Sequence, residues 1–436
     1  MQSYFLNDPS TPELVENFDL PVQDTDMQFS IAGFNGECNE LGNPAFQAAN
    51  VYISLVHALS YFKSQFTECG LNLNTWFGTK TLQINPRAGE QFNAYYARGL
   101  INYMYGKDNK NQLIYTADSA DVVTHELGHA ILDAAKPELF NLAATEVWSF
   151  HEGFSDICAV SAIMSYDKIV DKALAETNQT LQGSNIISKL AEQMGVACRH
   201  REYLRDLENN FSYVNPSTLP QNTNNDGLSS EIHSFSRIFS SVWYDIFVTI
   251  FNSEKQFLSI KEAVRSSRDK CFKWLVKGIL SSPKTPRYFE AVARGMSMAA
   301  KADKSPYNEV ITDIFTSRKI IPSIQILSEN LKNIDNFEKT LETHWGVLVK
   351  KETNKVIKLS DHLVTTLDVK ENPFLDTELE VAADEYVELD QDGNVVATMS
   401  VSEEQIINEA KQAAILMNLN RNIWSIENGR AVRISF

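Results

Sequence analysis

Two histidines stand four residues apart in the segment Val122-Val-Thr-His-Glu-Leu-Gly-His-Ala-Ile131, with an acidic residue between them. On a helix this spacing places His125 and His129 on one face, so one ring nitrogen of each can meet the same ion at about 2.0–2.1 Å. Glu126 is rotated by about 100° from His125, which brings its carboxylate to the edge of such a site. A base at that edge can take a proton from a metal-bound water. The helix also carries apolar residues that would bury one side of it, which argues against two surface histidines: Val122, Val123, Leu127, Ile131 and Leu132.

A third metal ligand is required, because a catalytic zinc takes three protein ligands and leaves one position open for water. The segment Trp148-Ser-Phe-His-Glu-Gly-Phe-Ser-Asp-Ile157 is helical by its pattern and places Glu152 and Asp156 on one face. We expect Glu152 to bind the metal and Asp156 to accept the second ring N–H of a ligand histidine. Two acids on one face of a buried helix would be costly without a cation. We expect His151 to lie beside the ligands and not to bind the metal.

The elements that position these residues can be predicted from hydrophobic spacing and turn residues. Apolar residues at helical spacing predict a helix over 44–66, and Ser119 or Asp121 can cap a second helix that runs to Ala135 and ends before Pro137. From there to Ile321 the pattern is mainly helical, with a polar loop over 209–230. Between the first two helices, short runs predict strands at 82–84, 92–96, 101–105 and 112–115.

These motifs resemble those of the thermolysin-like metallopeptidases, whose mark is His-Glu-x-x-His followed by Glu-x-x-x-Asp on the next helix. The likeness runs over roughly residues 44–321. It implies an α+β fold with a mixed α/β N-terminal lobe and a mainly helical C-terminal lobe. It also implies one catalytic zinc ion held by His125, His129 and Glu152, with Glu126 as the catalytic base.

Other stretches resemble the parts of this family that bind the substrate. The run Phe92-Asn-Ala-Tyr-Tyr96 looks like the family's edge strand, in which backbone groups at Asn93 and Ala94 pair with an extended substrate. Leu204-Arg-Asp-Leu207 is similar to the segment whose arginine, here Arg205, grips the carbonyl just beyond the scissile bond. The stretch that begins at Glu231 resembles the one whose histidine, here His233, stabilises the oxyanion. An ordinary surface arginine and a plain helix-start histidine stay open as alternatives.

The chain also departs from the family pattern around the oxyanion. The loop that carries a tyrosine in the family here holds Phe140 and Asn141, so we expect His233 to act without that partner. Twenty-two residues separate His129 from Glu152, slightly more than is typical. Asp226 stands seven residues ahead of His233, which is not the family's distance for the carboxylate that supports the imidazole.

A calcium site is expected to be absent or at most weakly bound. Asp121 matches a calcium ligand of the family, but the other acids of that site are not evident after Asp156. A second candidate, Asp390-Gln-Asp-Gly-Asn394, resembles part of a calcium loop. We favour a hairpin turn there, because predicted strands over 379–389 and 395–399 flank it.

The chain divides into four predicted parts. Residues 1–43 are an extended arm, 44–136 the α/β lobe, 137–321 the helical lobe, and 322–436 a small α+β appendage. In the appendage we also predict a helix from Ser402 to Met417 and a final hairpin around Asn428-Gly429. This appendage could dock a partner, cover the cleft as an inhibitory segment or stabilise the fold, and we favour the last.

The composition limits the classes of binding partner and the cellular compartment that we expect for this chain. The 39 basic and 56 acidic residues give a net charge of -17, spread along the chain, which argues against nucleic acids and anionic membranes as partners. No run approaches the roughly 20 apolar residues that a membrane span needs. Five cysteines without CxxC spacing favour a reducing compartment. We therefore expect the cytoplasm, with export without a classical signal peptide, or by a leader absent from this sequence, as the alternative.

The sequence predicts a zinc metalloendopeptidase that acts on peptide or protein substrates. An aminopeptidase with the same metal site is the first alternative, but an amine-binding segment of the Gly-Ala-Met-Glu-Asn type is missing. A binding protein on a peptidase scaffold is the second. Retention of Glu126 argues against it, because a structural zinc site needs no base.

Overall fold

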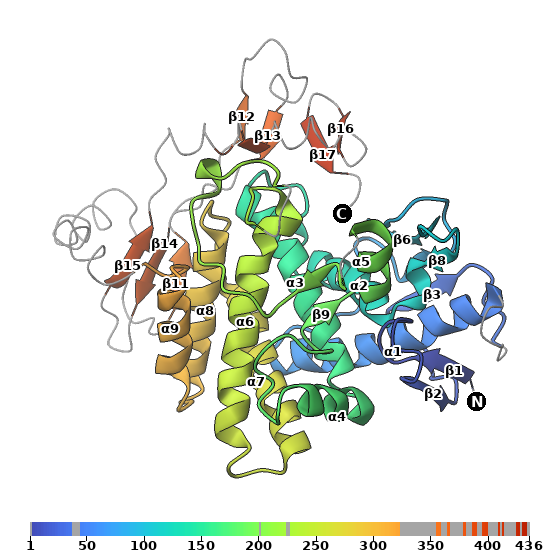
Figure 1. The fold of residues 1–436 in the computed structure, drawn as a ribbon. Coiled ribbons are helices and arrows are strands. Elements are labelled where there is room, and N and C mark those ends of the chain that lie inside the picture. The colour runs from blue at the N-terminus through green and yellow to red at the C-terminus, as the bar shows by residue number, and fades with distance from the viewer. Residues whose placement is uncertain are drawn as a thin grey trace.

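The computed structural model describes residues 2–36, 44–199, 202–223 and 227–322, and beyond them only short segments between residues 355 and 433. The described strands lie mainly before residue 116 and again after residue 355, whereas helices dominate the region from residue 120 to residue 317, as Figure 1 shows. The fold class is α+β, as predicted.

A four-stranded mixed sheet carries the cleft-facing strand of the N-terminal part. Its order is β3-β4-β6-β5, with β3, β4 and β6 parallel and β5 antiparallel to β6 at one edge. In β4 the buried Leu82 and Ile84 flank the exposed Gln83, the alternation of a half-buried strand. The predicted edge strand is confirmed, while β3 comes from the segment expected to be an extended arm. The bounds are β3 (Gln28–Ile31), β4 (Thr81–Asn85), β5 (Ala94–Ala97) and β6 (Leu100–Tyr103).

Two antiparallel hairpins and two long helices complete this part. The hairpins are β1 (Gln2–Phe5) with β2 (Val15–Phe18) and β7 (Tyr105–Lys107) with β8 (Leu113–Tyr115). The helices, which pack against each other, are α1 (Pro44–Glu68) and α2 (Ala120–Ala135).

Helix α2 is buried along almost its whole length, as its apolar residues predict. Ser119 occupies the position before the helix, as expected, but its hydroxyl does not cap the helix. It donates instead to the carboxylates of Asp8 and Asp121. The helix ends before Pro137, which lacks the N–H that a further helical turn would need.

Helices dominate the rest of the described chain. Helix α3 packs against α2 on one side and α6 on the other, and α7 packs against α6 and α8 (Figure 1). A two-residue pairing of β9 with β10 lies between α4 and α6 in the sequence. The bounds are α3 (Thr145–Ile163), α4 (Asp167–Glu176), β9 (Lys189–Leu190), α5 (Glu192–Arg199), β10 (Arg205–Asp206), α6 (Ile232–Glu254), α7 (Ile260–Ser281), α8 (Tyr288–Ala302) and α9 (Asn308–Ser317).

A glycine sets the distance between α2 and α3. A Cβ atom built on Gly128 would lie 2.8 Å from the Cα atom of Ser155 on α3, closer than carbon atoms normally approach. Because Gly128 has no side chain, the two backbones can come together at this point. The metal-ligand motifs of the two helices are brought face to face as a result.

The C-terminal end of α2 is tied to the far end of α7. The ammonium group of Lys136 is buried and donates to the carbonyl oxygen of Ile279 at 2.7 Å. It also donates to the carbonyl oxygen and the hydroxyl of Ser282. A buried charge held by three acceptors therefore fixes the end of α2 against the last turn of α7.

Beyond residue 322 the described segments are short strands and a few helical residues. Strand β14 pairs antiparallel with β11 and β15, and β13 pairs with β12 and β17. The predicted final hairpin is confirmed, since β16 and β17 pair antiparallel with Glu427 opposite Arg430. The turn at 390–394 and most of the helix predicted over 402–417 lie outside the described residues. The bounds are β11 (Lys355–Lys358), β12 (Val364–Thr366), β13 (Glu378–Glu380), β14 (Tyr386–Leu389), β15 (Val395–Met399), β16 (Trp424–Glu427) and β17 (Arg430–Arg433).

Candidate metal centre

The two packed helices bring the three predicted metal ligands together. His125 and His129 come from α2 and Glu152 comes from α3, and all three are buried. The Nε2 atoms of the histidines lie 3.2 Å apart. Glu152 Oε2 lies 3.4 Å from His125 Nε2, and Glu152 Oε1 lies 3.7 Å from His129 Nε2.

These separations fit a tetrahedral metal ion. Ligand atoms that each lie 2.0–2.1 Å from a tetrahedral centre are about 3.3–3.4 Å from one another. Two nitrogens and a carboxylate oxygen are also the donor set of a catalytic zinc site. Within the described part of the chain, the buried Oε2 atom of Glu126 has no hydrogen-bond partner. That atom is thus available to a metal-bound water.

The carboxylate of Asp156 contacts the ring of His125 at Nδ1, the nitrogen that does not face the metal position. Its Oδ1 atom lies 2.9 Å from His125 Nδ1, the contact predicted from the spacing of the two acids on α3. Burial opposes a charge on His125, but the hydrogen bonds that its ring donates to the carboxylates of Asp156 and Glu152 raise its pKa to about 9. The same contact leaves Nε2 of His125 pointing at the metal position, because Nδ1 is engaged.

Arg205 reaches the same carboxylate from strand β10. Its Nε atom donates to Asp156 Oδ1 at 3.0 Å and its terminal nitrogen lies 2.8 Å from that oxygen. The guanidinium also lies 3.3 Å from His125 Nδ1. Arg205 is therefore a neighbour of the metal ligands and not an isolated surface residue.

Glu126 stands on α2 beside the ligands, as its rotation from His125 predicts. It is buried, and burial raises the pKa of its carboxyl to about 7, with the charge on His125 opposing the rise. A carboxyl group that is half ionised near neutral pH can both accept and return a proton.

His233 lies in the first turn of α6 and faces the ligands from the other side. Its Nε2 atom is 3.4 Å from Glu152 Oε2, and 48% of its side chain is exposed. Against the desolvation of the ring, the carboxylates of Glu152 and Glu231 raise its pKa to about 8. Glu231, which sequence reasoning did not single out, accepts from His233 Nδ1 at 2.6 Å. Asp226, the residue considered there, lies outside the described residues.

His151 lies beside the metal site without joining it. Its ring stacks on that of His129, with centroids 5.8 Å apart, and it is absent from the three-residue ligand cluster. Phe140, which stands in the loop where the family has a tyrosine, is buried and packs edge-on to Tyr96.

A cleft of about 670 Å³ opens onto the metal position. His125, Glu126, Arg205 and His233 line it, together with Asn93 and Ala94 at the start of the edge strand. The Ala94 end of β5 pairs with Tyr103 of β6 on its inner side. Among the described strands β5 is the edge of this sheet, the position at which a further strand can be added.

Residues 1–133 match the family model described as thermolysin metallopeptidase, catalytic domain. Over this region the chain is similar to the thermolysin metallopeptidases. The match ends after His125 and His129, and Glu152, which completes the candidate metal cluster with them, lies beyond it. The match supports a metallopeptidase hydrolase, and the cluster is its candidate zinc site. None of the curated proteins searched matches this chain.

The family match corrects the extent expected from the sequence. Thermolysin-like character was expected from residue 44, whereas the match begins at residue 1. The structure gives the reason, because β3 at Gln28–Ile31 pairs with β4 in the peptidase sheet. The family match therefore includes the residues predicted to be an N-terminal arm.

A second cluster of buried acids lies beside the cleft of this peptidase. Asp8, Asp121 and Glu192 each have a carboxylate oxygen within 4.8 Å of the others. Burial, reinforced by the neighbouring acids, raises the pKa of Asp121 to about 6 and that of Glu192 to about 9. The sequence analysis identified no acidic residue after Asp156 that could join Asp121 in a cation site. The structure shows that Glu192 lies beside it. Oxygen donors of this kind suit calcium, but the expectation of absent or weakly bound calcium stays a prediction.

Among the described residues of this metallopeptidase, no helix is both long enough and apolar enough to cross a lipid bilayer. Cys158 and Cys271 are buried and free.

Proposed function

We propose that this chain is a zinc-dependent endopeptidase that hydrolyses internal peptide bonds. The observation that carries the proposal is the spacing of 3.2–3.7 Å among the ligand atoms of His125, His129 and Glu152, with Glu126 buried beside them. A purely structural zinc site would be closed by a fourth protein ligand and would need no base at its edge.

The metal supplies one part of the chemistry. When bound by His125, His129 and Glu152, zinc would polarise the substrate carbonyl and lower the pKa of a water molecule towards about 7. Asp156 holds the His125 ring in the tautomer that leaves Nε2 for the metal.

The side chains around the metal move the proton and hold the charge. Glu126 accepts a proton from the attacking water and later gives it to the leaving amine, a task suited to a carboxyl whose pKa lies near neutral pH. His233 Nε2 donates to the oxygen on which negative charge develops. In this proposal Arg205 holds the next carbonyl of the substrate along the chain.

The edge strand orients the peptide. Asn93 and Ala94 would pair their backbone groups with an extended substrate, which gives affinity without reading side chains. This mode of binding suits a site that cuts within a chain.

An aminopeptidase would instead need an acid to hold the free amine of its substrate. Of the described residues that line the cleft, the acids are Asp121, Glu126 and Glu231. Asp121 accepts from the backbone N–H groups of Val122 and Ala191, and Glu231 accepts from His233. Glu126 is assigned to the base, so we favour the endopeptidase.

The test is cleavage of quenched peptides blocked at both ends, by wild type and by Glu126→Gln, with zinc measured in both proteins. We expect about one zinc in each and a kcat at least about 100-fold lower in the variant. Equal activity in both proteins would refute the role of Glu126. Cleavage only of peptides with a free amino terminus would favour the aminopeptidase, and zinc without any cleavage would favour a binding protein.

A further inference from the structure

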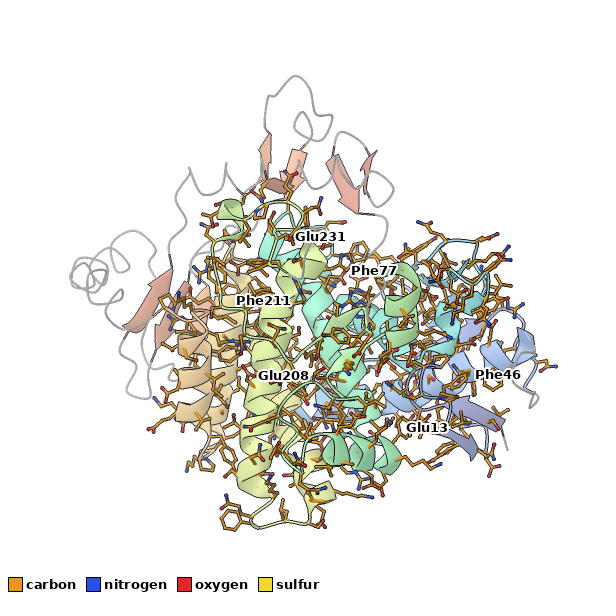
Figure 2. The ribbon with its side chains drawn as sticks, viewed as in Figure 1. Glu13, Phe46, Phe77, Glu208, Phe211 and Glu231 are labelled. Atoms are coloured by element: carbon orange, nitrogen blue, oxygen red, sulfur yellow. The ribbon has the colours of Figure 1, made fainter. Side chains whose placement is uncertain are left out.

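We propose that Glu231 is the carboxylate that positions the imidazole of His233 for its work on the oxyanion. This inference rests on the proposed peptidase function. It assigns a positioning role to a residue two places before the histidine, at the entrance to helix α6, where Figure 2 labels it.

The carboxylate of Glu231 is fixed by the helix that it caps. Its Oε2 atom accepts from the backbone N–H of Ser234 at 3.0 Å, and its Oε1 atom accepts from that of His233 at 3.2 Å. An acid at this position also meets the positive end of the helix dipole. Both oxygen atoms are therefore held in place before any substrate arrives.

The fixed carboxylate in turn orients the ring. Glu231 Oε1 lies 2.6 Å from His233 Nδ1, so Nδ1 carries the hydrogen and the opposite nitrogen, Nε2, faces the metal ligands. His233 Nε2 is 3.4 Å from Glu152 Oε2. With 48% of the His233 side chain exposed, packing covers only part of the ring, and a short charged hydrogen bond is the contact that can fix its direction.

The arrangement joins two functions in one side chain. Glu231 begins α6 and aims a residue of that helix into the cleft. The charged groups that act on the pair are Glu152, Glu126 and Arg205, which lie on the side of the metal ligands. Glu231 itself lines the cleft but points its carboxylate at His233 and at the helix end.

The capping role and the positioning role can be separated by variants. Glu231→Asn keeps a strong helix cap, because asparagine is among the best residues at that position, but it is shorter and uncharged. Glu231→Gln keeps the length and removes the charge. Asp226→Asn is the comparison variant, because it removes the other acid ahead of His233.

We expect kcat of Glu231→Asn to fall by about 10- to 100-fold, the usual loss when a carboxylate that orients a histidine is removed. KM should change by less than about twofold, and zinc content and the thermal midpoint should match wild type. In a His233→Ala background, Glu231→Asn should lower kcat no further, since the two residues act as one unit. Glu231→Gln should retain more activity than Glu231→Asn.

Three results would overturn the proposal. The first is an equal loss from Glu231→Asn with and without His233, which would mark a purely structural residue. The second is a loss in Asp226→Asn with none in Glu231→Asn. The third is an NMR signal of the His233 ring that does not change when Glu231 is replaced. Nitrogen-15 NMR of the zinc-loaded protein should show hydrogen on Nδ1 of His233 in wild type and a changed signal in Glu231→Asn, and identical signals would refute the contact. The NMR measurement does not depend on enzyme turnover. An inactive wild type would therefore refute the peptidase proposal, while the NMR signals would still test the contact between Glu231 and His233.

Discussion

The close approach of α2 and α3 at Gly128 predicts that a substitution outside the metal ligands should lower the affinity for zinc. Replacing Gly128 by alanine places a Cβ atom 2.8 Å from Ser155 Cα and 3.1 Å from Ser155 Cβ. Carbon atoms prefer about 3.5–4.0 Å, so the helices must part locally by about 0.7–1.2 Å. A metal site tolerates ligand displacements of only about 0.2 Å. The ligand histidines lie on one of these helices and Glu152 on the other, so the variant should spread the site.

The Gly128→Ala substitution should change both the unfolding free energy and the affinity for zinc. Overpacking of this kind costs about 1–3 kcal/mol of unfolding free energy, offset by about 1 kcal/mol because alanine favours the helix more than glycine. Zinc affinity should fall by about 10- to 100-fold, the loss seen when the support of a metal ligand is disturbed.

The assay is a competition titration for zinc against a coloured chelator, with urea unfolding of the zinc-free proteins alongside. Gly295→Ala is the matched control. Its Cβ atom would lie 2.8 Å from Gly278 Cα, where α8 meets α7, and neither helix carries a metal ligand. Both variants should lose similar stability, but only Gly128→Ala should lose zinc affinity. Wild-type zinc affinity in Gly128→Ala would refute the argument that helix spacing sets the site.

Three further predictions concern the metal, pH and the buried lysine. His129→Ala and Glu152→Ala should each lose the metal, which metal analysis of the purified proteins would show, and full zinc content in either would contradict the ligand assignment. Burial raises the pKa values of Asp8 and Asp121, and the charge of Asp8 adds to the rise at Asp121. These two carboxyls therefore bind more protons in the folded protein than in the unfolded chain between about pH 4 and pH 6, so their contribution to the unfolding free energy should fall as pH rises through that window. In Asp8→Asn this fall should be smaller by about 1–3 kcal/mol in urea unfolding with a chelator present, and an unchanged pH dependence would contradict the repulsion. Lys136→Met should lower unfolding free energy by about 1–3 kcal/mol, because it removes a charged donor to the carbonyl oxygens of Ile279 and Ser282, and a neutral result in the same assay would count against that contact.

Most of the candidate metal centre could be predicted from the spacing of residues within single helices. His125, His129 and Glu126 are fixed relative to one another by a single helix, as are Glu152 and Asp156, so their geometry follows from the helical repeat. The strand around residues 92–96 could be predicted from its local residue types, and its place at the sheet edge from the resemblance to the family.

Contacts between distant segments could not be found in this way. Strand β3 pairs with β4 across the whole of α1, and nothing in the residues Gln28–Ile31 specifies that partner. Asp8 meets Ser119, 111 residues later, for the same reason. Ser119 looked like a cap because its type and position suit one, but two nearby carboxylates compete for its hydroxyl. Glu231 carried a usable signal, since it precedes a helix, but capping alone does not reveal which way its carboxylate turns.

The buried ammonium of Lys136 has a consequence for the order in which the protein forms. All three metal ligands lie between residues 125 and 152, but the acceptors that hold the end of α2 belong to Ile279 and Ser282. During synthesis the ligands emerge well before these acceptors. A nascent chain that stops short of α7 thus contains every atom that touches the metal but lacks the anchor for one of the two helices. Tight metal capture, and any proteolytic activity that depends on it, should then begin only after α7 has been made and docked.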